Sequence, residues 1–223
     1  MNIAEAMEQR HSVRQYTDRA LSEDTISAFQ EEIDACNRES GLHIQLVVNE
    51  PKAFEGFMAH YGKFRGVKNY IAMVGEKNSL LDETCGYYGE RLVLFAQQMG
   101  LNTCWVALTY SKVKTAFEVR ENEKLCLIIA LGYGQNQGVP HKSKDISKVV
   151  QTKEKMPDWF QKGVKAALLA PTAMNQQKFL FKRDGERVSV KAGRGFYAKV
   201  DLGIVKYHFE IGAGEAGWKW EDQ

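Results

Sequence analysis

The feature that most limits the possible folds is an almost uninterrupted apolar run from Tyr70 to Gly75. A strand with one face in water alternates apolar and polar side chains, whereas a strand in a sheet covered on both faces is apolar throughout. The run therefore predicts a strand inside a covered sheet. Segments typical of helices and of strands alternate along the rest of the chain, which indicates an α/β or α+β architecture with helices on both faces.

Start and stop signals place the other elements. Ser22 is a favourable N-cap and Gly41 a favourable stop signal, so residues 22–40 are expected to form a helix. Asp184 and Gly185 form a dipeptide that tight hairpin turns prefer, between predicted strands 178–183 and 186–191. Residues 135–155 lack apolar periodicity and are expected to form a long connection. Periodicity predicts the remaining elements: strands 43–49, 103–108 and 125–131, and helices 54–60, 79–99, 158–169 and 201–215.

Two of the predicted helices resemble each other. Residues 86–100 and 203–217 each begin and end with a glycine, and their apolar stripes coincide when the two segments are aligned. This similarity favours one domain, residues 1–223, built from two repeated halves, 1–134 and 156–223, that residues 135–155 join as a loop. Chance similarity between two amphipathic helices is the alternative.

Composition limits the partners. The chain carries 30 basic and 28 acidic residues, a net charge of +2, so no general attraction to nucleic acid or membranes is expected. The first residues do not form a signal sequence, and no apolar run is long enough to span a bilayer, so a cytoplasmic location is expected. The four cysteines and five histidines are scattered, which favours buried thiols in a reducing compartment and predicts no metal site.

The most informative segment for function is residues 169–179, where an apolar helix runs into Pro171. Because proline lacks an N–H and disfavours helix in the residue before it, the helix is expected to stop near Ala170. Thr172 and Asn175 then lie on an irregular segment, where they can offer a donor and an acceptor to a planar polar ring. A helix-to-strand connection that Asn175 caps by itself is the alternative.

A second segment, Arg10–Tyr16, follows a short predicted N-terminal helix. Arg10 and Arg14 lie four residues apart, so on one helical turn they would point the same way and could hold a phosphate with two guanidinium groups. Ser12, between them, could donate to the same group. In the alternative interpretation, the two arginines only lie at the end of a helix and bind no phosphate.

These two segments, together with Gly100–Leu108, resemble the nitroreductase family of FMN-dependent oxidoreductases. They are similar to the family's A-P-S-x-x-N-x-Q, R-x-S-x-R and G-L-G-T-C-W motifs. The resemblance covers nearly the whole chain and implies an α+β, nitroreductase-like FMN-binding fold with a central mixed sheet flanked by helices. It implies cofactor contacts from all three motifs: Arg10, His11, Ser12, Arg14, Trp105, Val106, Ala107, Pro171, Thr172, Met174 and Asn175.

The resemblance also assigns roles around the flavin. A basic group after a Gly-Tyr turn completes the family's phosphate site, which adds Lys142 and Lys144, with a solvated loop as the alternative. An N–H near Val106 and Ala107 directed at flavin N5 would favour the reduced state. Arg14 near N1 and O2 would stabilise the anionic reduced ring.

The chain departs from the family pattern in places. The proline motif lies in the second half of the chain, which resembles a rearranged subfamily with repeated halves. Thr172 replaces the family's serine, and Lys178 and Phe179 replace its Pro-Trp pair. These changes affect the assignment of a substrate more than the assignment of fold and cofactor.

The resemblance implies an FMN-dependent NAD(P)H oxidoreductase that reduces nitroaromatic, quinone or similar planar acceptors by hydride transfer through flavin N5. The cofactor makes and breaks the bonds, so no catalytic side chain is predicted. A non-catalytic flavin- or nucleotide-binding protein of the same fold is the alternative. In the family the flavin lies between subunits, so a homodimer is expected, although one chain with repeated halves could mimic that dimer.

Overall fold

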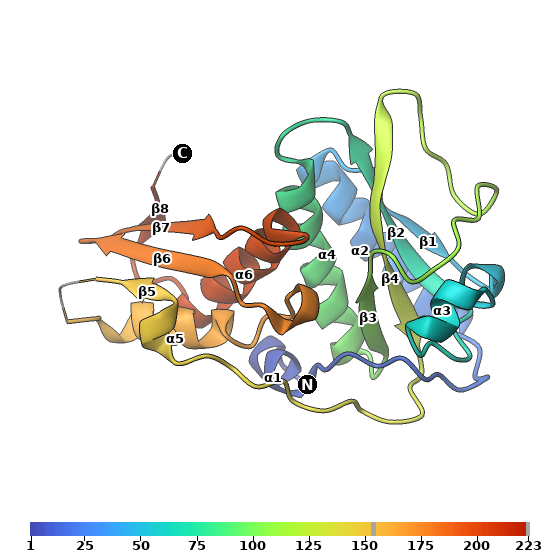
Figure 1. The fold of residues 1–223 in the computed structure, drawn as a ribbon, viewed down its shortest axis with the longest axis horizontal. Helices are drawn as coiled ribbons and strands as arrows, with labels where there is room; N and C mark the ends of the chain where they lie inside the picture. Colours follow the sequence, from blue (N-terminus) through green and yellow to red (C-terminus); the bar gives the residue numbers. More distant parts are fainter. Residues whose placement is uncertain (153–154, 222–223) are drawn as a thin grey trace.

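The strands form two four-stranded sheets in the computed structural model, which describes residues 1–152 and 155–221 (Figure 1). The first sheet is antiparallel and has the order β1-β2-β4-β3. The second has the order β5-β6-β7-β8, with an antiparallel central pair and a parallel strand at each edge. The strands are β1 Gln45–Val47, β2 Asn69–Glu76, β3 Asn102–Val106, β4 Glu123–Gly132, β5 Val150–Gln151, β6 Phe179–Asp184, β7 Arg187–Ala192 and β8 Lys219–Trp220.

The α+β class is confirmed, and the strands expected in one central sheet are divided between two. Ser22 accepts a hydrogen bond from the N–H of Thr25, and Gly41 ends the same helix in a left-handed conformation, both as the sequence predicts. The helix before Pro171 ends at Ala167. In the described ranges the α-helices are α1 Ile3–Gln9, α2 Glu23–Ser40, α3 Phe57–Tyr61, α4 Leu81–Gln98, α5 Asp158–Ala167 and α6 Ala198–Ala213.

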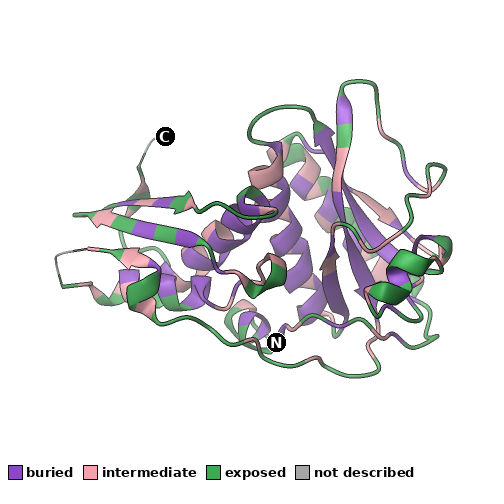
Figure 2. Ribbon diagram, viewed as in Figure 1, coloured by how far each residue is buried: buried purple, intermediate pink, exposed green. Residues whose placement is uncertain are grey.

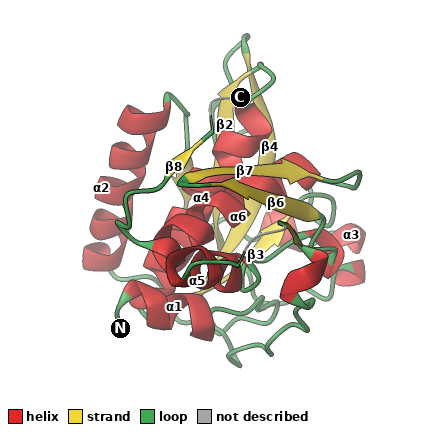
Figure 3. Cartoon of the chain, turned by 90° about the vertical axis from the view of Figure 1, so that its left-hand side faces the viewer, coloured by secondary structure: helices red, strands yellow, loops and turns green. Residues whose placement is uncertain are grey.

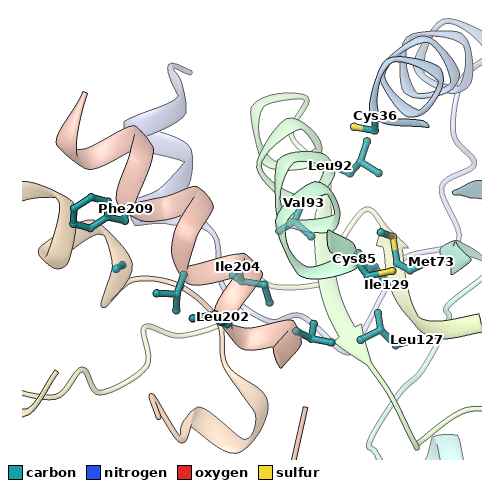
Figure 4. Close-up of a cluster of buried hydrophobic side chains, with 14 of the residues drawn as sticks. Cys36, Met73, Cys85, Leu92, Val93, Leu127, Ile129, Leu202, Ile204 and Phe209 are labelled. Atoms are coloured by element: carbon teal, nitrogen blue, oxygen red, sulfur yellow. The ribbon is translucent and has the colours of Figure 1, made fainter. Parts of the chain in front are cut away.

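Strand β2 is buried from Asn69 to Gly75, which confirms its prediction as a covered strand (Figure 2). Its side chains alternate between two apolar clusters. Ile71 and Met73 pack with residues of α2 and α4, whereas Tyr70 lies in the cluster on the other face. Figure 4 shows the first cluster, with Met73 close to Cys85 of α4.

The two sheets are connected through α4 and α6, because α4 packs on the first sheet and α6 on the second (Figures 1 and 3). These helices approach each other closely at two glycines. A Cβ atom at Gly86 would lie 2.0 Å from the carbonyl oxygen of Val200, and one at Gly203 would lie 1.9 Å from that of Glu83. Only glycine allows this backbone contact, since real Cβ atoms do not approach other atoms so closely.

Two local predictions need adjustment. In the β6–β7 hairpin Asp184 pairs with Arg187, so the turn residues are Gly185 and Glu186 rather than Asp184 and Gly185. Residues 135–145 contain no helix or strand, as expected of a long connection, but a 3₁₀ turn and β5 follow; residues 153–154 lie outside the described residues. No helix in the described part of the chain is both long and apolar enough to cross a membrane.

Candidate functional site

A cavity of about 340 Å³ lies where four segments meet: the extended chain after α1, the end of β3, the turn after α5 and the start of α6. Its volume falls within the range of about 300–1,000 Å³ that is typical of small-molecule sites. Predicted site residues from all three motifs line it: Ser12, Arg14, Trp105, Val106, Ala107, Pro171, Thr172 and Met174. The other lining residues are Cys104, Leu108, Leu127, Ala173, Phe196, Tyr197, Val200, Asp201 and Ile204.

The N-terminal wall is extended rather than helical. Helix α1 ends at Gln9, and Arg10 already has an extended conformation. The next residues run beside β3, where the N–H of Val13 donates to the carbonyl of Thr103 at 3.0 Å. The prediction that Arg10 and Arg14 share a helical turn is therefore wrong, because pairing with β3 and burial of Val13 extend the chain.

The two arginines consequently have different environments. Arg14 is exposed and lines the cavity, and its guanidinium carbon lies 5.9 Å from the centre of the Phe64 ring. Arg10 is 3% exposed and does not line the cavity; its Nε lies 3.8 Å from a carboxylate oxygen of Glu90. Burial lowers the pKa of Arg10, and the Glu90 carboxylate partly offsets this effect. His11 is half-buried and does not line the cavity, and its pKa is lowered by burial and by the charge of Arg10.

The turn after α5 has an unusual backbone. Met174, Asn175 and Gln177 have φ angles of 53°, 52° and 43°, a left-handed conformation that non-glycine residues rarely adopt. Side-chain hydrogen bonds hold it. The hydroxyl of Thr172 accepts from the N–H of Gln177 at 3.0 Å, and the amide of Asn175 donates to the carbonyl of Lys142 at 3.0 Å. Gln177 in turn donates to the Asn175 side-chain oxygen at 2.7 Å.

Asn175 therefore uses its side chain within the protein, and it does not line the cavity. This arrangement favours the alternative in which Asn175 caps the turn. Lys142 and Lys144 also lie behind the turn rather than at the cavity. The ammonium of Lys144 donates to the carbonyl oxygens of Gln176 and Gln177 at 2.7 and 2.9 Å. The phosphate role of both lysines stays a prediction.

Asp201 is the charged residue of the cavity that sequence reasoning missed. It lies in the first turn of α6 and is 5% exposed. One carboxylate oxygen accepts from the N–H of Ala173 at 2.9 Å, and the other from the side chain of Gln176 at 2.6 Å. Burial raises the pKa of Asp201 to about 6, although both hydrogen bonds act in the opposite direction. An acidic residue between Val200 and Leu202 in an apolar helix was the available signal.

Exposed apolar side chains surround the mouth of the cavity. Leu108, Met174 and Phe196 are 66%, 91% and 76% exposed. They come from three separate segments, so the opening has an apolar rim. Beneath the rim the cavity presents one guanidinium, from Arg14, and one carboxylate, from Asp201.

Solved nitroreductases have the same fold. A putative nitroreductase from Thermotoga maritima superposes with a TM-score of 0.65 at 26% identity, covering 95% of this chain and 83% of that one. A putative nitroreductase from Desulfovibrio desulfuricans, crystallised in complex with FMN, superposes with a TM-score of 0.55 at 19% identity, covering 70% of this chain and 99% of that one. No curated protein sequence matches this chain.

The family comparison covers almost the whole chain. The family model described as "Putative TM nitroreductase" matches residues 2–213. The match includes every segment that lines the cavity. The resemblance found in the three sequence motifs is thus confirmed, and the chain belongs to this nitroreductase family.

Proposed function

We propose that this protein is an FMN-dependent NAD(P)H oxidoreductase that reduces nitroaromatic, quinone or similar planar acceptors. The observation that carries the proposal is the meeting of three distant segments around one cavity: Ser12 and Arg14, Trp105 to Ala107, and Pro171 to Met174. The FMN bound to the Desulfovibrio protein supports the choice of cofactor through the shared fold.

The residues present fit such a cofactor. The apolar walls suit a flat ring, and the guanidinium of Arg14 suits a group that gains negative charge. Arg10 offers a second, buried positive charge, and its Nε has no hydrogen-bond partner among the described residues. When bound, FMN would supply hydride transfer between the nicotinamide and the acceptor. The chain would position both reactants, while Leu108, Met174 and Phe196 would exclude water at the rim.

The first experiment is a spectrum of the purified protein. We expect flavin absorbance, release of FMN on denaturation identified by mass, and oxidation of NADPH or NADH in the presence of a quinone. Protein that binds FMN but oxidises neither nicotinamide would instead support the non-catalytic flavin-binding alternative. Colourless protein that takes up no added FMN would refute the proposal.

Arg10 provides the sharpest variant for cofactor binding. Arg10→Ala should weaken FMN binding by roughly 1.5 kcal/mol, about tenfold, because it removes a buried positive charge behind the cavity wall. Arg183→Ala is the matched control, because Arg183 lies in β6 of the second sheet, outside the segments that line the cavity. Equal FMN affinities for the two variants would remove Arg10 from the cofactor site.

The proposal includes a cytoplasmic homodimer, since two-fold dimers are the commonest assemblies of soluble proteins. Exposed Phe57 and Tyr61 on α3 offer apolar surface for such a contact. Sedimentation at micromolar concentration should give a species of twice the chain mass. A monomer that keeps FMN and turns over would contradict the dimer and leave the enzyme assignment intact.

We also propose that residues 1–134 and 156–223 are repeated halves of a single domain, with residues 135–155 as the joining loop. The crossing of α4 and α6 supports this proposal. Gly86 and Gly203 begin the two similar sequence segments, and they are the glycines at which these helices touch.

A further inference from the structure

Ionisable side chains form a buried cluster behind the cavity wall. Glu90 of α4 and His208 of α6 are fully buried, and Arg10 is almost fully buried. One Glu90 oxygen lies 2.8 Å from Nε2 of His208 and 3.8 Å from Nε of Arg10. The other accepts from the indole N–H of Trp105 at 3.0 Å. Because Trp105 lines the cavity, one side chain separates the cluster from any bound molecule.

The hydrogen bonds of His208 determine how many protons the cluster holds. Its Nδ1 lies 3.1 Å from the carbonyl oxygen of Ala166, which can only accept, so Nδ1 carries a proton. Its Nε2 faces an oxygen of Glu90, and that contact also needs a proton. A neutral imidazole has only one N–H. The Trp105 donor and the Arg10 charge both favour a carboxylate at Glu90, so His208 is the imidazolium.

Glu90 and His208 therefore cancel each other's charge, which leaves the charge of Arg10 uncompensated. The separation of 3.8 Å between Arg10 and Glu90 is longer than a hydrogen bond, and the Nε of Arg10 has no partner in the described ranges. A buried guanidinium whose Nε–H has no acceptor is costly.

No other group near the cluster supplies the missing negative charge in the part of the chain that the structure describes. Burial raises the pKa of the Cys104 thiol in β3 and of the Tyr207 phenol in α6, so both stay neutral. Burial lowers the pKa of His11, beside Arg10 in the chain. Arg91, next to Glu90 in α4, is cationic and pairs with two glutamates of α2, Glu32 and Glu39.

We propose that Glu90 and His208 form an ion pair with no net charge, which leaves Arg10 as a buried positive charge for an anion bound at the cavity. They are positioning residues, since they act through Arg10 and Trp105. The identity of the anion rests on the proposed function. It is either the phosphate of FMN or the anionic reduced ring, and the charge acts strongly because a buried charge is screened less than a charge in water.

The proton count can be measured without any cofactor. Histidine ring nitrogens in the ¹⁵N-labelled full chain are observed by NMR at neutral pH, and His208→Gln identifies the signals of His208. We expect protons on both ring nitrogens of His208. A ring nitrogen of His208 that lacks a proton would overturn the proposal, whether or not the protein binds FMN.

Two variants then distinguish an effect of the net charge of the cluster from an effect of side-chain packing. His208→Gln leaves Glu90 to neutralise Arg10, so the net charge of the cluster falls from +1 to zero. Glu90→Gln lets His208 lose its extra proton, so the net charge stays at +1. Both variants replace the same ion pair between α4 and α6 by an amide contact, so a purely structural effect would be similar in both.

The readouts are the dissociation constants of FMN and riboflavin and the reduction potential of the bound flavin. If the anion is the phosphate, His208→Gln should bind FMN on the order of tenfold more weakly than Glu90→Gln, with equal riboflavin affinities. If the anion is the reduced ring, His208→Gln should have the lower reduction potential. Equal values of all three quantities in the two variants would overturn the proposal. Wild-type protein that binds no flavin would refute the proposed function instead, while the NMR measurement would still show whether both ring nitrogens of His208 carry protons.

Discussion

Replacing Asp201 by asparagine should change how the stability of the protein depends on pH. Burial raises the pKa of Asp201 from 3.8 to about 6 in the folded protein. The folded state therefore holds this proton more tightly than the unfolded state, and ionisation of Asp201 opposes folding. A shift of this size corresponds to about 3 kcal/mol, which the wild type loses as the pH rises through the interval between the two pKa values. Asp201→Asn has no charge to bury and escapes this loss.

The assay compares urea unfolding of the wild type and Asp201→Asn at several pH values between about 4 and about 7. Asparagine loses part of the hydrogen bonding to Ala173 and Gln176, but that cost does not depend on pH. The stability of the variant relative to the wild type should therefore rise by roughly 2.5 kcal/mol across this range, which is most of the full effect. Asp184→Asn, at an exposed position in the β6–β7 hairpin, is the matched control and should show no comparable trend. A constant difference between wild type and Asp201→Asn would refute the reasoning.

Gly203→Ala should lower the stability measured in thermal unfolding by about 3 kcal/mol or more, because its Cβ would lie 1.9 Å from the Glu83 carbonyl oxygen. An unchanged Tm would mean that α4 and α6 can move apart without cost. Asn175→Ala should cost about 1–3 kcal/mol through the lost hydrogen bond to the Lys142 carbonyl and leave the flavin potential unchanged. A shifted potential with normal stability would instead support the predicted contact of Asn175 with the cofactor. Phe209→Ala should cost about 3–5 kcal/mol in urea unfolding, since this ring is fully buried, and a loss below about 1 kcal/mol would contradict its place in the core.

Elements governed by neighbouring residues could be predicted from the sequence. The apolar run of β2 and the caps of α2 are local signals, and both elements formed where they were expected. The division of the strands between two sheets could not be predicted in this way. A strand pattern shows which residues are buried, but it does not show which other strand supplies the hydrogen bonds.

The candidate site shows the same limit. Ser12, Trp105 and Thr172 were found from their motifs, and the cavity brings them together. The predicted helical turn from Arg10 to Arg14 was wrong because Thr103 of β3, distant in the sequence, pairs with Ser12 and extends the chain there. Asp201 was missed because its partner, the N–H of Ala173, is a backbone group that no sequence pattern identifies.

The glycine contact between α4 and α6 has a consequence for the width of the cavity. Trp105 and Val200 both line the cavity; Trp105 rests against Gly89 of α4, and Val200 belongs to α6. Since the two helices touch through their backbones, no layer of side chains between them can swell or shrink at the crossing. Gly86 and Gly203 thus fix the distance between α4 and α6. Gly86 and Gly203 do not line the cavity, but the helix spacing that they set limits the thickness of a molecule that can enter it.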